Sequence, residues 1–345
     1  MSRRSLTLLI AAIGTAVAIA VSVLIPVPYV ILGPGPTLNT LGKDSSGQQL
    51  ITISGHPSYP TSGHLNMVTV SYQGCQGDTF NIFTALVAWL NPHEAVVPEG
   101  EICPAGQTQQ QTQQQDTQEM TGSQQAATAA ALTELNIPYQ TQVVVVQTVP
   151  GYPADGVLRA GDVITAVDGK PVTGASGLSA LIYAHPAGST LTVTILRGGQ
   201  TQQVQVSTKL SAGHPVMGVE ITEQYKFPFD VTISVGDIGG PSAGLMFALG
   251  IIDKLTPMNL TGGKFIAGTG EIEASGQVDP IGGIQQKMIG ARDAGATIFL
   301  TPTANCPDTK GAVPAGLRLV SVSTLSQAVN DLEAIKAGQP VPSCP

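Results

Sequence analysis

GGPSAG, at residues 239–244, is the stretch that decides the fold of the C-terminal part of the chain. Before it, VTISV at residues 231–235 alternates as a strand does, and after it LMFAL at residues 245–249 is apolar and favours a helix. A serine at such a strand-to-helix turn is either an ordinary helix N-cap or a nucleophile. In the second case, backbone N–H groups of the turn residues Gly240 and Ala243, at the positive end of the helix dipole, would stabilise an oxyanion formed at Ser242.

A nucleophilic serine needs a base, and this region offers lysine in place of histidine. His214, at the edge of this region, is its only histidine, so a Ser-His-Asp triad is not expected. Lys287 falls at helical spacing from Ile284, Met288 and Ala291, so all four share one apolar face. A lysine there either extends its amine from the edge of that face to solvent or acts as a buried base with a lowered pKa.

The motifs that follow Ser242 resemble, in order and spacing, the proteolytic domain of Lon proteases. They are GPSAG at residues 240–244, TGEI at 269–272, GQV at 276–278, PIGG at 280–283, Lys287, AGA at 294–296 and IFL at 298–300. The resemblance implies a Ser-Lys dyad with Ser242 as nucleophile and Lys287 as base. It also implies a supporting hydrogen bond from Thr269, and it leaves Glu271 a structural role.

Two features depart from the Lon pattern. An acidic residue often stands shortly before GPS in that family, whereas this chain has Ile238-Gly239-Gly240, with Asp237 further upstream. The chain also lacks the phosphate-binding pattern GxxxxGK[ST], which GGKF at residues 262–265 does not fit. We therefore expect no ATP-driven unfolding, no bound cofactor and no metal site.

Residues 143–208 contain a second set of motifs, which resembles a bacterial PDZ domain. The set comprises VPGYPADG at residues 149–156, LRAGDVI at 158–164 and VDGKPV at 167–172. PDZ domains bind an extended peptide end by adding it to a sheet edge. We expect the carboxylate-binding loop before the strand at residues 143–146, but NIPYQT at residues 136–141 has no glycine-rich loop. The domain therefore either captures peptide ends or only packs and regulates.

The N-terminus reads as a membrane anchor. Arg3 and Arg4 precede an almost wholly apolar run from Leu6 to about Val27, which is long enough to span a bilayer. The positive-inside rule places the two arginines in the cytoplasm and the bulk of the chain outside. A cleaved signal peptide is the alternative, because residues 18–20 read AIA, although the apolar run continues beyond them.

Composition narrows the remaining possibilities. Charged residues make up 11% of the 345 residues and the net charge is −8, which argues against a nucleic-acid partner. None of the four cysteines forms a CxxC pair, so zinc is not expected, and export would favour disulfides. Pairing neighbours gives Cys75–Cys103 and Cys306–Cys344, but four cysteines allow three pairings, and free thiols are the alternative.

The sequence thus predicts a multidomain α+β protein with an N-terminal transmembrane helix, a small β-rich region, a PDZ domain and a Lon-type α/β proteolytic domain. The expected segments are an anchor at 1–27, a β-rich region at 28–105, a Gln-rich spacer or helix at 106–142, the PDZ domain at 143–210, the Lon-like domain at 213–338 and a tail at 339–345.

The whole arrangement resembles the membrane-anchored PDZ–Lon proteins of Gram-positive bacteria. It implies an ATP-independent serine endopeptidase at the cell membrane, outside the cytoplasm, that cleaves flexible or unfolded protein segments and needs no cofactor. The resemblance also implies a homo-oligomer. The alternative is a catalytically inactive scaffold that binds protein partners at the membrane through its PDZ domain.

Overall fold

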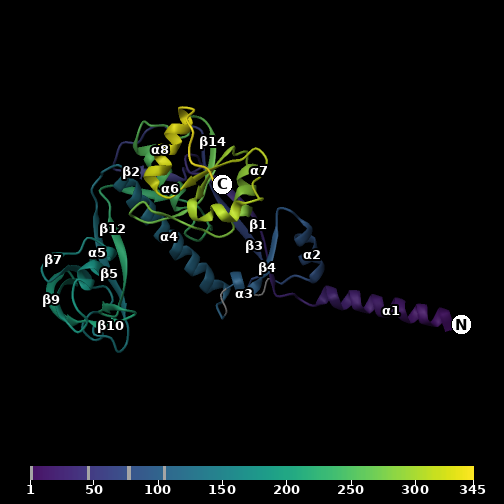
Figure 1. Ribbon diagram of the computed structural model, residues 1–345, viewed down its shortest axis with the longest axis horizontal. Coiled ribbons are helices and arrows are strands. Elements are labelled where there is room, and N and C mark those ends of the chain that lie inside the picture. Colours follow the sequence, from purple (N-terminus) through teal and green to yellow (C-terminus); the bar gives the residue numbers. More distant parts are fainter. Residues whose placement is uncertain (1–2, 45–46, 76–78, 104–105) are drawn as a thin grey trace. The chain divides into compact units, whose positions relative to one another are not determined.

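The computed structural model describes residues 3–44, 47–75, 79–103 and 106–345 (Figure 1). The chain divides into two compact units, one formed by residues 1–137 together with 229–345 and the other by residues 138–228. The second unit is therefore an insertion between two halves of the first.

The first unit is built on a six-stranded sheet in the order β18-β17-β14-β3-β1-β4. Its strands are β1 (Tyr29–Asn39), β3 (His64–Gln73), β4 (Ala95–Pro98), β14 (Phe265–Gly268), β17 (Ile298–Pro302) and β18 (Arg318–Val322). The strands from β18 to β3 run parallel, whereas β1 is antiparallel to both β3 and β4. N-terminal and C-terminal segments thus share one sheet.

Helices cover both faces of this sheet (Figure 1). α7 (Ile284–Asp293) lies on one face and α6 (Gly244–Leu255) on the other. The further helices of this unit are α2 (Ile82–Leu90), α3 (Glu99–Ile102), α4 (Gln109–Glu134), α8 (Leu325–Lys336) and the 3₁₀ helix η1 (Thr303–Thr309). Val68 and Ala267 pack in one core cluster with Ile284 and Met288 of α7. Neighbouring Gly268 faces the other way, because a Cβ added there would meet the sulfur of Met246 on α6 at 2.7 Å.

Short ladders and the N-terminal helix complete the first unit. The short strands are β2 (Ile51–Ser54) paired with β13 (Asp230–Ile233), and β15 (Glu271–Ile272) paired with β16 (Val278–Asp279). The helix α1 (Arg3–Leu24) has 22 residues and carries no acidic residue in its first turn and no basic residue in its last. Among the described residues, it is the one helix long and apolar enough to cross a membrane.

The second unit is a small antiparallel sheet in the order β12-β5-β6-β8-β9, with one helix and short side ladders. Its elements are β5 (Gln140–Thr148), β6 (Val163–Val167), β7 (Lys170–Pro171), α5 (Ala175–Tyr183), β8 (Thr190–Arg197), β9 (Gln200–Ser207), β10 (Lys209–Ser211), β11 (His214–Val216) and β12 (Val219–Lys226). Asp168 and Gly169 both have positive φ in the predicted turn between β6 and β7.

A buried ion pair joins β8 to the loop that precedes β6. The carboxylate of Asp162, which is 1% exposed, accepts hydrogen bonds from Arg197 at 2.6 and 2.7 Å. These bonds hold the pKa of the Asp162 carboxyl below its ordinary value. The aspartate of the sequence motif GDVI is therefore a structural residue here.

The structure divides the chain at other places than the sequence suggested. β12 pairs with β5 along its length, so the small compact unit extends to residue 228, beyond the expected boundaries at 143–210. The expected start of the proteolytic domain at 213 lies within this compact unit. The predicted β-rich region at 28–105 is not separate, because β1, β3 and β4 complete the sheet of the C-terminal half.

Of the two alternatives for the Gln-rich segment at 106–142, a spacer or a helix, the structure has the helix. The segment forms the long helix α4, whose first turn is closed by a capping box between Thr108 and Gln111. Met120 and Ser123 are buried, as is the run from Ala127 to Leu132, because this half of α4 packs on α6. The alanines let the two helices approach closely, so only the glutamine-rich half is solvated.

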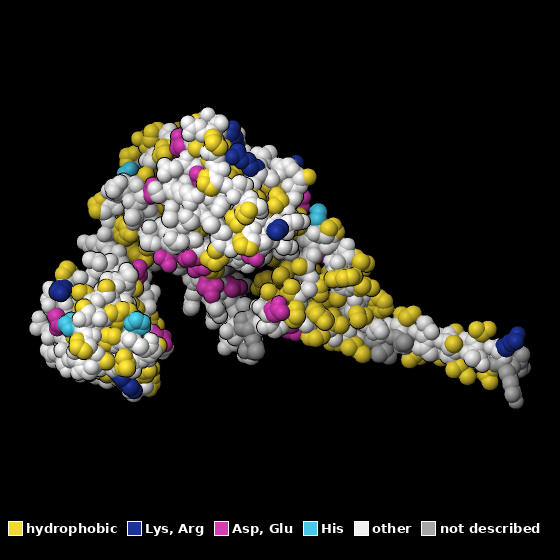
Figure 2. Space-filling view, viewed as in Figure 1, with side chains coloured by type: hydrophobic (Ala, Val, Ile, Leu, Met, Phe, Trp, Pro, Cys, Tyr) yellow, Lys and Arg dark blue, Asp and Glu magenta, His cyan; other side chains and the backbone are white. Residues whose placement is uncertain are grey.

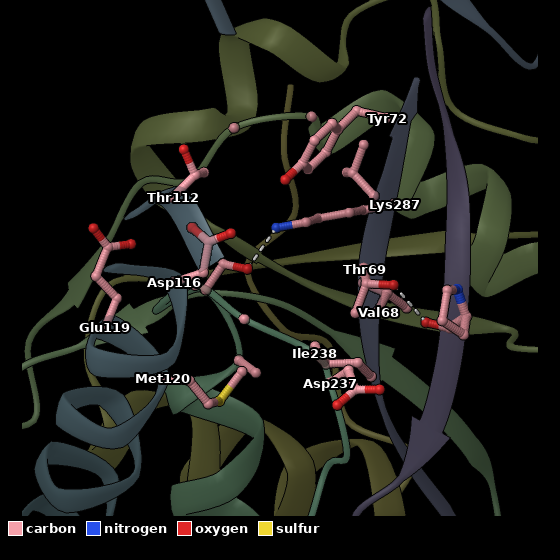
Figure 3. A pocket seen from close by; sticks show the side chains of 18 of the residues that line it. Val68, Thr69, Tyr72, Thr112, Asp116, Glu119, Met120, Asp237, Ile238 and Lys287 are labelled. Carbon is pink, nitrogen blue, oxygen red and sulfur yellow. Dashed lines mark hydrogen bonds between the residues drawn. The ribbon is translucent and has the colours of Figure 1, made fainter. Parts of the chain in front are cut away.

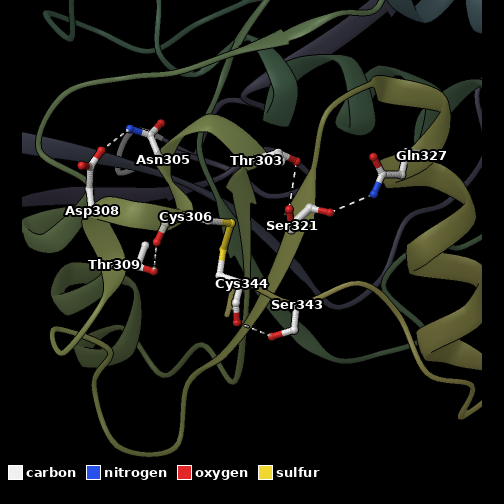
Figure 4. The surroundings of a disulfide bond; sticks show 9 residues. All are labelled: Thr303, Asn305, Cys306, Asp308, Thr309, Ser321, Gln327, Ser343 and Cys344. Carbon is white, nitrogen blue, oxygen red and sulfur yellow. Dashed lines mark hydrogen bonds between the residues drawn. A yellow bond between two sulfur atoms is a disulfide. The ribbon is translucent and has the colours of Figure 1, made fainter.

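The four cysteines pair as sequence neighbours, in the disulfides Cys75–Cys103 and Cys306–Cys344. Figure 4 shows the second one linking η1 to the last residues of the chain. The backbone of Ser321 in β18 also donates a hydrogen bond to the carbonyl of Pro342. The expected tail at 339–345 is therefore attached to the first unit.

Candidate active site

Ser242 lies in the turn between β13 and α6, two residues before the helix begins. The N-cap of α6 is Ala243, which makes no side-chain capping hydrogen bond, so Ser242 does not serve as the cap. Gly240 has φ of 84°, a conformation that glycine adopts without strain. The glycine-rich turn thus leaves the hydroxyl of Ser242 available to a partner from another element.

That partner is Lys287, which lies on α7 as the helical spacing predicts. Its side chain is 3% exposed and lies on the same buried face as Ile284, Met288 and Ala291. The Nζ of Lys287 is 2.9 Å from the Oγ of Ser242 and 3.2 Å from the Oγ1 of Thr269. Figure 3 shows the amine directed into a pocket and joined by a dashed line to a hydroxyl oxygen.

Burial of Lys287 decides the protonation of its amine. Desolvation lowers the pKa of Lys287 from 10.5 to about 8, because the charged form loses its hydration. No carboxylate forms an ion pair with this amine among the residues that the structure describes. A substantial fraction of the amine is therefore neutral near pH 8 and able to accept a proton.

Thr269 connects the two residues through its own hydroxyl. It follows β14 directly, is fully buried, and donates a hydrogen bond from Oγ1 to the carbonyl oxygen of Ser242 at 2.9 Å. The N–H of Gly270 donates to the same carbonyl at 2.9 Å. Two donors thus fix the Ser242 peptide, while the Thr269 oxygen accepts from Lys287.

The backbone donors around Ser242 are not equivalent. The N–H of Gly240 donates to the backbone carbonyl of Asp116 on α4 at 3.0 Å, so it is not free for an oxyanion. Within the described part of the chain, no acceptor meets the N–H of Ala243. Of the two turn residues that the sequence suggested, Ala243 is thus the one with an available donor.

A cavity of about 570 Å³ opens beside the Ser242 hydroxyl. Its lining comes from β1, β3, α4, the turn before α6, and the start of α7. Three carboxylates line it, namely Asp116, Glu119 and Asp237, whereas Lys287 is the only cation among its described lining residues. Burial, and secondarily the charge of Glu119, raises the pKa of Asp116. The cavity therefore presents negative charge to whatever enters it.

Several lining residues could not be found from the sequence. Tyr72 and Met120 lie far from the GPSAG motif in the chain and reach the cavity only because β3 and α4 complete this unit. Asp116 lies in a glutamine-rich tract whose sequence shows no hydrophobic periodicity, so nothing in the sequence pointed to its role. Glu271 lies on β15, away from the cavity lining, and its pKa is raised by burial and by Asp279. No cluster of metal-binding side chains occurs in the described ranges.

Comparisons with known proteins agree with both resemblances. Residues 220–334 match the Lon protease (S16) C-terminal proteolytic domain, and residues 111–208 match the PDZ domain. The second match begins inside α4, whereas the compact unit begins at Pro138. The chain thus combines a PDZ domain with a Lon-type proteolytic domain, and the predicted α+β multidomain class is confirmed.

Curated relatives share only part of this chain. Lon protease of Roseiflexus castenholzii is 45% identical over 69 residues, which are 20% of this chain and 8% of that protein. Lon protease 1 of Bacillus subtilis is 30% identical over 118 residues, covering 33% of this chain and 15% of that protein. Lon protease 2 of Herpetosiphon aurantiacus is 41% identical over 93 residues, which are 26% of this chain and 11% of that protein. The chain therefore spans a small fraction of these relatives.

Solved structures similar to part of this chain include PDZ domains. The PDZ domain of an SdrC-like protein from Listeria monocytogenes is 26% identical and covers 23% of this chain and 85% of that one, with a TM-score of 0.22. The corresponding domain from Listeria innocua is also 26% identical and has the same TM-score of 0.22. The match covers 23% of this chain and 92% of that one. The domain assignment rests on the family matches.

Proposed function

We propose that this protein is a membrane-anchored, ATP-independent serine endopeptidase with Ser242 as nucleophile and Lys287 as general base. The observation that carries the proposal is the 2.9 Å separation of the Ser242 Oγ from the Lys287 Nζ, at the edge of a cavity. Burial favours the neutral amine, which is the form a base requires. The relationship to Lon proteases supports the same chemistry.

The proposed reaction begins with transfer of the Ser242 hydroxyl proton to the neutral amine of Lys287. The Ser242 oxygen then attacks the carbonyl carbon of a peptide bond, and the negative charge develops on the carbonyl oxygen. The N–H of Ala243, near the start of α6, stabilises that charge. Lys287 returns its proton to the leaving amine, and water hydrolyses the acyl-enzyme by the same steps in reverse order.

The proposed substrates are flexible or unfolded protein segments. The sequence carries no phosphate loop, so no step that extracts a chain from a folded protein is expected. An extended segment could enter the cavity between β3 and α4 without prior unfolding by another machine. Peptide ends could be recruited by the PDZ domain, where β5 lies inside the sheet and β12 is the edge strand. β5, the strand after the expected carboxylate-binding loop, is paired on both sides.

Anchoring is proposed from α1. Its 22 residues span about 33 Å, which matches the hydrocarbon core of a bilayer. Arg4 at its start favours the cytoplasmic side for that end. Both disulfides suit an oxidising compartment, in which the rest of the chain would then lie. Assembly into a homo-oligomer stays a prediction.

One observation favours the alternative, an inactive scaffold. The Gly240 N–H donates to the Asp116 carbonyl, which leaves only Ala243 of the two suggested turn donors available, and Ile238 and Gly239 precede GPS where Lon proteases often have an acidic residue. A protein that only binds partners would need no complete oxyanion site.

The two functions are separated by hydrolysis of an unfolded protein without nucleotide. The full chain is incubated in detergent or vesicles, and Ser242→Ala is the matched control. The peptidase predicts cleavage that the control lacks. Equal product from both proteins, or none from either, would favour the scaffold.

A further inference from the structure

Helix α2 exposes its large side chains in the opposite way to a helix of a soluble protein. Ala85 and Ala88 point inward and pack with Ile31 and Phe80. The exposed side is made of large apolar residues, namely Ile82, Phe83, Leu86, Val87, Trp89 and Leu90. In a soluble protein the large apolar side chains would face the core. Figure 2 shows hydrophobic side chains gathered over the region of α2 and β4.

The degree of exposure is high for side chains of this size. Val87 and Trp89 are each 69% exposed, and Leu90 is 67% exposed. No charged residue occurs between Asp78 and Glu94, so α2 itself contributes no charge to the apolar surface. Contiguous exposed apolar surface of this kind marks a contact with another apolar phase or with a protein.

The backbone places α2 close to the end of α1. Val27 donates a backbone hydrogen bond to the carbonyl of Phe80 at 3.1 Å, and Pro26 and Asn81 form an antiparallel bridge. Asn81 is the N-cap of α2, and Pro26 lies only two residues after the last residue of α1. Two extended residues span at most about 7 Å, and the bridge from Pro26 to Asn81 adds about 5 Å, so α2 begins within about 12 Å of the end of α1.

This upper limit places the start of α2 close to the lipid headgroup layer in which α1 would end. A bilayer has a hydrocarbon core of about 30 Å and a total thickness of about 40–45 Å, which leaves roughly 5–8 Å on each side. Tryptophan concentrates at that interface, with its ring among the headgroups and the upper acyl chains. We propose that α2 lies in the membrane interface and that its apolar side inserts among the lipids beside the point where α1 leaves the bilayer.

The proposal rests on the proposed anchoring by α1 and adds a second membrane contact. Two contacts restrict rotation of the first unit about α1. A single helical anchor followed by a flexible link would allow the first unit to rotate. With α2 in the interface, the same face of the unit would always point toward the lipid. A second copy of the chain is the competing occupant of this apolar surface.

The chain supplies its own probe, because Trp89 is its only tryptophan. The full chain is placed in vesicles of phosphatidylcholine and phosphatidylglycerol, and vesicle flotation verifies anchoring. Trp89 emission is then compared in vesicles whose lipids carry bromine atoms at a shallow or a deep position along the acyl chains. We expect brominated lipid to reduce the emission about twofold, most strongly with shallow bromines.

A matched pair of variants tests the same point by substitution. Leu86→Gln with Val87→Gln and Leu90→Gln makes α2 polar, and brominated lipid should then quench Trp89 much less. The control carries Val146→Gln, Leu210→Gln and Val313→Gln, which alter three other exposed apolar residues and should leave the quenching unchanged. Near-ultraviolet circular dichroism verifies that both variants are folded.

Each contrary outcome identifies a different failure. If the protein floats with the vesicles but Trp89 is quenched by aqueous acrylamide and not by brominated lipid, the interfacial helix is wrong and the anchor stands. A blue-shifted emission that is insensitive to both quenchers means that protein covers α2, which also overturns the proposal. A protein that does not float overturns both the anchor and the interfacial helix.

Discussion

The backbone carbonyl of Asp116 accepts a hydrogen bond from the N–H of Gly240 at 3.0 Å. This bond joins α4 to the turn that carries Ser242, although the two segments are far apart in the sequence. Gly239 lies against the same turn of α4, where an added Cβ would come within 2.5 Å of the Asp116 Cβ. The contact helps to fix the turn on which the proposed nucleophile stands.

Gly239→Ala should disturb this contact. The new methyl group would also approach the Asp116 backbone carbonyl carbon to 3.2 Å, so α4 or the turn must shift. We expect the free energy of unfolding to fall by about 1–3 kcal/mol, which is the typical cost of adding a methyl group to a packed region. Urea denaturation measures this free energy. Gly100→Ala is the control, because an added Cβ there meets nothing within 4 Å. Equal stabilities of the two variants would contradict the contact.

Thr269→Val should impair catalysis and leave substrate binding largely intact. Valine keeps the shape of threonine but can neither accept from Lys287 nor donate to the Ser242 carbonyl. We expect kcat to fall about 10- to 100-fold with little change in KM, since the loss affects positioning of the dyad. Thr269→Ser should restore most of the activity. A kcat unchanged in the valine variant would remove Thr269 from the account.

The stability of the fold should depend on pH through Lys287. Its folded pKa of about 8 lies below the ordinary 10.5, so between these values the unfolded chain binds more protons than the folded one. The free energy of unfolding contributed by Lys287 therefore rises as pH increases from about 8 to 10.5. Below pH 8 the buried amine costs about 3 kcal/mol.

The matched variant for this effect is Lys287→Met, which has a similar length and no charge. At pH 7 the variant should be more stable than the wild type, and the difference should shrink toward pH 10. Denaturant titrations at several pH values measure the difference. A difference that does not vary with pH would mean that the amine is not desolvated in the folded protein.

The cavity should prefer substrates with positive charge near the scissile bond. Asp116, Glu119 and Asp237 line it, and Lys287 is largely neutral in its reactive form. Peptides with lysine in place of glutamate should be cleaved several-fold faster at low salt, and the ratio should fall as salt is added. Glu119→Gln should reduce the ratio. A ratio that is independent of salt would exclude selection by these carboxylates.

Much of the candidate site was predictable because its residues lie in one dense set of local motifs. The strand-turn-helix pattern around Ser242 and the helical spacing around Lys287 place both residues on elements that the sequence defines. Their contact required the likeness to Lon proteases, since spacing along a chain does not determine distance in space. The apolar N-terminal helix was also readable from local pattern, whereas the cysteine pairing was one of three that the sequence allowed.

The domain boundaries and the far wall of the cavity were not predictable in the same way. β3 pairs with β14 across the whole PDZ insertion, and no local signal marks such a pairing. The mixed polar and alanine composition of α4 concealed that one half packs on α6. Asp116 and Tyr72 therefore reached the site through tertiary contacts alone. The inverted exposure of α2 likewise became visible only once Ala85 and Ala88 were seen to face inward.

The most direct test of the proposed dyad is the pH dependence of Ser242 acylation by a serine-directed probe in the full-length protein. Mass spectrometry of the modified peptide reports the rate at this residue alone. Acylation should rise with pH to a plateau, reach half its maximum near pH 8, and be absent in Ser242→Ala and Lys287→Met. A rate that is independent of pH, or that persists in Lys287→Met, would contradict Lys287 as the base, and a Ser242 that never reacts would contradict the peptidase.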